Sequence, residues 1–95
     1  MKITITKKEP AACGGTWYTG WTGAWDFQAK VYDTDSKYGI SGGRVSKLTI
    51  ASKATGRVVA RYDRGWDILP DAGDMATLAE IHRLEAALFY YLMEE

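Results

Sequence analysis

Apolar and polar residues alternate through much of the first two thirds of the chain. A period of two is the pattern of β-strands that bury one face. The clearest example spans residues 25–32, where one face carries only apolar side chains: Trp25, Phe27, Ala29 and Val31. The alternation predicts that Phe27 is buried and that Gln28 faces solvent.

Four other segments have strand character: residues 2–7, 16–21, 44–51 and 57–63. The connections between several of them are short, and Gly56 can supply the positive φ that a tight turn needs. Short connections favour antiparallel pairing between strands that follow one another in the chain. The stretch that follows these strands contains a proline and no clear period, so we expect it to be irregular.

The period changes in the C-terminal segment. Residues 75–93 contain neither Gly nor Pro and are rich in Ala, Leu and Glu, which predicts one long helix. Asp74 is the favoured N-cap and Asp71 the alternative. Glu85 falls inside the apolar arc of this helix, which is formed by Leu78, Ile81, Leu84, Leu88, Phe89, Tyr91 and Leu92. The pattern therefore predicts a single α+β domain over residues 1–95. We expect this domain to be a four- or five-stranded, mostly antiparallel meander sheet with the C-terminal helix packed on one face.

Composition narrows the possible functions. Lys+Arg and Asp+Glu both number 12, so the formal net charge is zero, which argues against binding of nucleic acid by overall charge. A local basic face could still bind nucleic acid. The single cysteine, Cys13, excludes an internal disulfide. The first residues form no continuous apolar segment and no long apolar run follows, so we expect a cytoplasmic protein without a membrane span.

Three segments of the middle of the chain carry a resemblance: residues 25–32, residues 38–48 and residues 62–67. They resemble a family of small uncharacterised bacterial proteins associated with Firmicutes and with their phages or mobile elements. The resemblance implies a bacterial cytoplasmic or mobile-element setting. It implies no activity, and no catalytic residue follows from it.

Catalytic and metal-binding patterns are weak. Cys13 and His82 are each the only residue of their type and have no third group to orient them, so we predict no catalytic pair. Asp33 begins an EF-hand-like stretch that fails at its glycine position and at its terminal glutamate position. We therefore expect no metal and no cofactor, and the chain is more consistent with a non-enzymatic module.

The candidate ligand-binding residues are polar or aromatic and lie in three places. Arg44 follows a glycine-bearing loop that could form an anion nest, although ordinary turn geometry is the favoured interpretation. Glu85 needs a cationic or hydrogen-bonding partner, for which Arg44, Arg61, Arg64 or an aromatic donor are candidates. The densest cluster lies between residues 62 and 67 and contributes Asp63, Arg64, Trp66 and Asp67.

Three tryptophans stand four residues apart, at Trp17, Trp21 and Trp25, among several glycines. If exposed, they would form a stacking surface for a sugar, a base or a peptide. If buried, they would be the core of a small domain whose first half is poor in Leu and Ile. We favour the buried arrangement, because a short chain needs large apolar anchors.

The end of the helix is apolar almost all round and predicts self-association through Phe89, Tyr90, Tyr91, Leu92 and Met93. The first functional hypothesis is therefore a binding or accessory module that acts through protein–protein contact, as a homodimer or with a protein partner. The second is nucleic-acid binding by a sheet face that carries Lys30, Tyr32, Lys47 and Arg61, with Arg44 and Arg57 near its edges. The third is a hydrolase-type enzyme that uses Asp63, Asp67 or Glu85.

Overall fold

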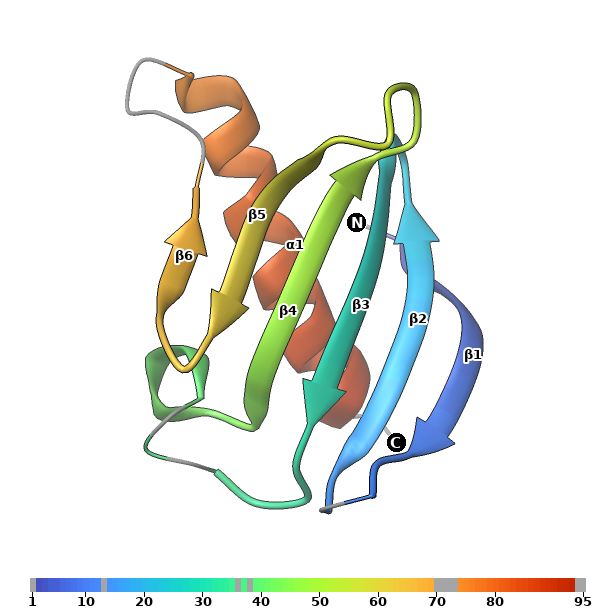
Figure 1. Ribbon diagram of the computed structural model, residues 1–95, viewed down its shortest axis with the longest axis vertical. Helices are drawn as coiled ribbons and strands as arrows, with labels where there is room; N and C mark the ends of the chain where they lie inside the picture. Colours follow the sequence, from blue (N-terminus) through green and yellow to red (C-terminus); the bar gives the residue numbers. More distant parts are fainter. Residues whose placement is uncertain (1, 13, 36, 38, 70–73, 94–95) are drawn as a thin grey trace.

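The computed structural model describes residues 2–12, 14–35, 37, 39–69 and 74–93, without the side chains of residues 41 and 89–93. Its six strands form one antiparallel sheet in which neighbours in the chain are also neighbours in the sheet (Figure 1). The strands are β1 (Thr4–Pro10), β2 (Thr16–Thr22), β3 (Trp25–Val31), β4 (Val45–Ser52), β5 (Val58–Asp63) and β6 (Trp66–Ile68). The helical elements are the short 3-10 helix η1 (Ile40–Gly42) and the long helix α1 (Met75–Met93).

The predicted α+β meander with a C-terminal helix is confirmed, but the sheet has more strands than expected. The additional strand is β6, which lies in the stretch expected to be irregular. It is only three residues long, too short to show a period in the sequence. A tight turn at Arg64, whose φ is +61°, returns the chain so that Trp66 pairs with Tyr62 of β5.

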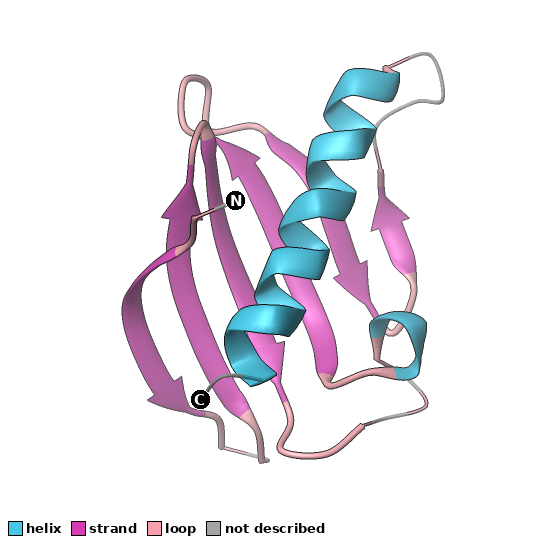
Figure 2. Ribbon diagram, turned by 180° about the vertical axis from the view of Figure 1, so that it is seen from behind, coloured by secondary structure: helices cyan, strands magenta, loops and turns pink. Residues whose placement is uncertain are grey.

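Helix α1 crosses one face of the sheet and leaves the other face without a covering element in the described part of the chain (Figure 2). We call these the covered face and the open face. Helix residues Ile81, Leu84 and Leu88 are fully buried against the sheet, where Leu48 and Ile50 of β4 are also fully buried. Each such side chain contributes about 1.5–3 kcal/mol through burial of apolar surface.

The predicted register of β3 is confirmed. Phe27 is 3% exposed on the covered face, whereas Gln28 is exposed on the open face. The predicted N-cap is confirmed too, because the Asp74 Oδ1 atom accepts a hydrogen bond of 3.2 Å from the backbone N–H of Thr77. Gly56 adopts a φ of +73° in the turn between β4 and β5, as expected.

The orientation of β2 follows from its pairing with β3. Gly20 lies opposite Phe27, and a Cβ atom at Gly20 would come within 2.9 Å of the Phe27 ring. The Phe27 ring therefore occupies the space above Gly20 on the covered face. Because side chains alternate along a strand, Trp17 and Trp21 are turned to the open face.

Candidate functional site

The tryptophans do not form the buried cluster that we favoured from the sequence. Trp21 is 39% exposed and Trp17 is half-buried, both on the open face. Trp25 is half-buried on the covered face, where its indole Nε1–H donates a hydrogen bond of 2.8 Å to Glu80 of α1. The spacing of four residues misled the prediction because the turn between β2 and β3 lies between Trp21 and Trp25 and changes the face.

The open face carries a row of cross-strand partners that runs over five strands. Glu9 of β1 pairs with Trp17 of β2, and Trp17 pairs with Lys30 of β3. Lys30 pairs in turn with Lys47 of β4, and Lys47 pairs with Asp63 of β5. Directly opposed residues of a sheet lie about 5 Å apart. An aromatic ring and two ammonium groups therefore share one line across the sheet, with a carboxylate at each end.

The next row on the same face is polar. Thr19, Gln28, Thr49 and Arg61 are successive cross-strand partners from β2 to β5. A hollow of about 140 Å³ lies beside this row, and Trp17, Thr19 and Gln28 line it. Its lining offers hydrogen-bond donors and acceptors next to an aromatic ring.

Cations on the open face lie over its aromatic rings. The Lys30 Nζ atom is 5.3 Å from the centre of the Tyr32 ring, and the Lys53 Nζ atom is 4.0 Å from the centre of the Trp21 ring. Both distances are typical of cation–π contacts. The face thus combines aromatic and basic groups.

Ion pairs neutralise only part of this charge. Lys47 lies 3.8 Å from Asp63, and Lys53 lies 3.8 Å from Asp26. Within the described ranges, Lys30 and Arg61 form no salt bridge. The nucleic-acid hypothesis named Lys30, Lys47 and Arg61 together, and the register places all three on this face.

The charge of the chain is divided unevenly between its sheet-forming segment and its C-terminal segment. Residues 1–73 hold eleven of the twelve Lys and Arg and seven of the twelve Asp and Glu, a net charge of +4. Residues 74–95 hold the remaining one basic residue and five acidic residues, a net charge of −4. The neutral total therefore hides a basic sheet segment and an acidic helix segment.

The cluster at residues 62–67 becomes the hairpin between β5 and β6. Trp66 packs edge-to-face on Tyr62 with ring centres 5.2 Å apart, and it contacts the core. Asp63 projects to the open face, while Arg64 and Asp67 are exposed. Glu85 lies on helix α1, on the side of the sheet opposite to Asp63.

Glu85 has a different partner from those expected. Its Oε2 atom lies 3.7 Å from His82 Nδ1, one helical turn away, rather than beside Arg44, Arg61 or Arg64. The Oε1 atom is buried without a hydrogen-bond partner among the described residues. Burial raises the pKa of the Glu85 carboxyl above its ordinary value of 4.5, and the contact with His82 opposes this effect.

The glycine loop before Arg44 is a turn rather than an anion nest. The N–H groups of Gly42 and Gly43 donate hydrogen bonds of 3.0 Å to the carbonyl oxygens of Gly39 and Ile40. These donors are already used within η1. Arg44 itself is half-buried and lines a separate hollow with Tyr32 at the end of β3.

Some predicted residues fall outside the described part of the chain. This is the case for Cys13 and for the side chains of Phe89, Tyr90, Tyr91, Leu92 and Met93. The self-association and protein–protein contact expected from the helix end stay predictions. Within the described ranges, no three metal-binding side chains gather, and no helix has the length and apolarity to cross a membrane.

Most of the chain matches a known protein family. A family model of a domain of unknown function, DUF7678, matches residues 16–85. The matched segment runs from the start of β2 into α1, and it includes Trp17, Lys30 and Lys47. No curated protein and no solved structure matches the chain. The uncharacterised family expected from the sequence is thus found, while the bacterial and mobile-element setting stays a prediction.

Proposed function

The chain belongs to the DUF7678 family, and we propose that it binds single-stranded nucleic acid through the open face of its sheet. The observation that carries this proposal is the row formed by Trp17, Lys30 and Lys47. A base stacks on an aromatic ring, and a phosphate is neutralised by a neighbouring ammonium group. Both groups stand here on adjacent strands of a rigid sheet.

The choice of a single strand follows from the aromatic side chains. In a duplex the flat faces of the bases are covered by their neighbours, so an aromatic ring cannot stack on them. Trp17 lies on the open face next to its cross-strand partner Lys30, a position that an unstacked base could occupy. The polar hollow beside Trp17 offers Gln28 and Thr19 to the edge of a base.

The electrostatics support a modest, local contact. Lys30 and Arg61 have no carboxylate partner among the described residues, and Lys47 has only an exposed one. The sheet-forming segment, residues 1–73, carries a net charge of +4. Since few phosphates can be neutralised at once, the affinity should fall with salt by a logarithmic slope of about −0.7 per phosphate contacted.

The test is fluorescence anisotropy with labelled oligothymidylate and oligouridylate, measured at several salt concentrations. We expect binding that weakens as salt rises. The double variant Lys30→Gln, Arg61→Gln should bind much more weakly. Arg83→Gln removes one charge from the exposed side of α1 and should leave binding unchanged.

A second variant tests stacking separately from charge. Trp17→Ala should weaken binding by about 1–3 kcal/mol, the range measured for a base on an aromatic ring. Trp17→Phe keeps an aromatic face and should retain most of the affinity. The proposal fails if neither oligonucleotide binds at low salt, or if Arg83→Gln weakens binding as much as the double variant does.

A further inference from the structure

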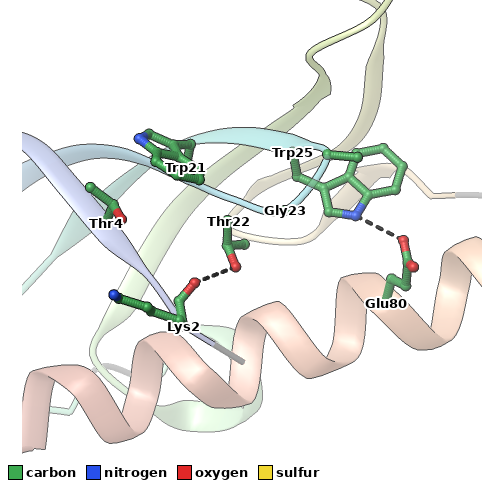
Figure 3. A pocket seen from close by; sticks show the side chains of 8 residues that line it. Lys2, Thr4, Trp21, Thr22, Gly23, Trp25 and Glu80 are labelled. Atoms are coloured by element: carbon green, nitrogen blue, oxygen red, sulfur yellow. Dashed lines mark hydrogen bonds between the residues drawn. The ribbon is translucent and has the colours of Figure 1, made fainter.

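A second candidate site lies at the other side of the hairpin between β2 and β3. There, a cleft of about 560 Å³ opens between the start of β1, this hairpin and helix α1 (Figure 3). Trp21, Trp25 and Glu80 are among its lining residues, together with Lys2 and Thr22. Its volume is in the range of sites that hold small molecules.

The cleft contains a carboxylate, Glu80, that forms no ion pair within the described ranges. Glu80 is half-buried, and its Oε2 atom accepts the 2.8 Å hydrogen bond from the Trp25 indole. No salt bridge to Glu80 is formed by any described residue. Figure 3 shows the ammonium group of Lys2 pointing away from Glu80. The indole therefore positions the carboxylate, and no cation among the described residues pairs with it.

The aromatic walls favour the same kind of ligand. Tryptophan is the best aromatic partner for a cation, because the face of its ring is electron-rich. Trp25 lies directly beside Glu80, so a cation that meets the carboxylate can also contact this ring. The cleft continues past Thr22, Gly23 and Ala24 at the hairpin turn, so an apolar body has room next to the charge.

We propose that this cleft binds a small organic cation, a primary ammonium or guanidinium group on a short apolar chain. The charged group would lie against Glu80 and Trp25, and the apolar chain would extend along the hairpin turn. The proposal is independent of nucleic-acid binding, because Glu80 and Trp25 belong to the covered side of the sheet.

The experiment is a titration of the ¹⁵N-labelled protein with n-butylammonium, followed through the indole N–H resonance of Trp25. The resonance is assigned by its loss in Trp25→Phe. We expect a saturable shift with the cation, because a charge at Glu80 changes the hydrogen bond to this N–H. The neutral analogue n-butanol should bind at least about tenfold more weakly.

Two variants complete the test. Glu80→Gln keeps a hydrogen-bond acceptor for Trp25 but removes the charge, and it should weaken n-butylammonium binding about tenfold. Asp26→Asn removes a carboxylate of the same hairpin on the open face and should have little effect. Equal binding of n-butanol, or an unchanged affinity in Glu80→Gln, would overturn the proposal. The absence of any saturable shift in the wild-type protein would overturn it as well, whatever the variants do.

Discussion

The two faces of this sheet are built from the same strands but differ in almost every physical respect. On the covered face, Phe27, Leu48 and Ile50 are at most 3% exposed and pack against one side of α1. On the open face, cross-strand partners are polar, charged or aromatic, and Trp21 is 39% exposed. Stability should therefore depend on the covered face and nucleic-acid binding on the open face.

Leu84→Ala should produce the largest loss of stability. Leu84 is fully buried between α1 and the sheet, and its truncation leaves a cavity. We expect the free energy of unfolding to fall by about 2–5 kcal/mol in denaturant titrations. Thr49→Ala, on the open face, is the control and should change it by less than about 0.5 kcal/mol. Similar losses for both variants would contradict the division between the faces.

Gly20→Ala tests why Trp17 and Trp21 face solvent. A Cβ atom at Gly20 would overlap the carbonyl oxygen of Thr4 and press on the Phe27 ring. We expect a loss of about 1–3 kcal/mol in the free energy of unfolding, from overpacking. Gly65→Ala is the matched control, since a Cβ atom there would meet no described atom within 4 Å. If Gly20→Ala is as stable as the wild type, our account of the β2 register is wrong.

Glu85→Gln should stabilise the protein. The wild-type carboxylate is partly desolvated and one of its oxygens lacks a hydrogen bond among the described residues, an arrangement that costs about 1–3 kcal/mol. We expect the variant to unfold at a higher denaturant concentration at pH 7, because it carries no charge at this position. Asp67→Asn, which neutralises an exposed carboxylate, is the control and should have little effect.

The Glu85 carboxyl also makes the free energy of unfolding depend on pH. Its pKa is raised in the folded protein, so the protonated form is favoured by folding. This contribution is fully present below pH 4.5, the ordinary pKa, and is lost as the pH rises through the raised pKa of the folded state. The stability difference between Glu85→Gln and the wild type should therefore grow as the pH rises above 4.5. A difference that does not vary with pH would mean that the carboxyl is not desolvated.

Lys47→Gln should have the smallest effect on stability. Its ion pair with Asp63 is exposed on both sides, and such pairs contribute about 0–1 kcal/mol. We expect a denaturation midpoint close to that of the wild type, together with a measurable loss of oligonucleotide affinity. A large loss of stability would show that the open face also supports the fold.

Much of the fold could be predicted because local patterns were unambiguous. Residues 25–32 have only apolar side chains on one face, so only one orientation of this strand buries an apolar face. The helix had a clear period and an N-cap at Asp74. In β2, by contrast, Tyr18 on one face and Trp17 on the other are both large aromatics, so the period alone did not select a face.

The candidate sites could be predicted only in part, because local patterns place residues on a face but do not show contacts between distant elements. The basic residues Lys30, Lys47 and Arg61 were assigned to one face from their spacing, and the strand pairing confirms that placement. The arginines predicted as partners of Glu85 were wrong. Its partner is His82, because a contact within one turn of the helix competes well with distant side chains. The contact between Trp25 and Glu80 joins residues that are 55 positions apart and had no signal in the sequence.

The sequence by itself determined the α+β class, the identity of the core strands and the extent of the helix, since these follow from periods of two and of 3.6 residues. Only the tertiary structure decided which tryptophans face solvent, that a sixth strand pairs with β5, and that Glu80 meets Trp25. Each of these outcomes depends on how separate elements fill space together. In β2, the Phe27 ring above Gly20 decides the face, and this contact exists only after β2 and β3 have paired.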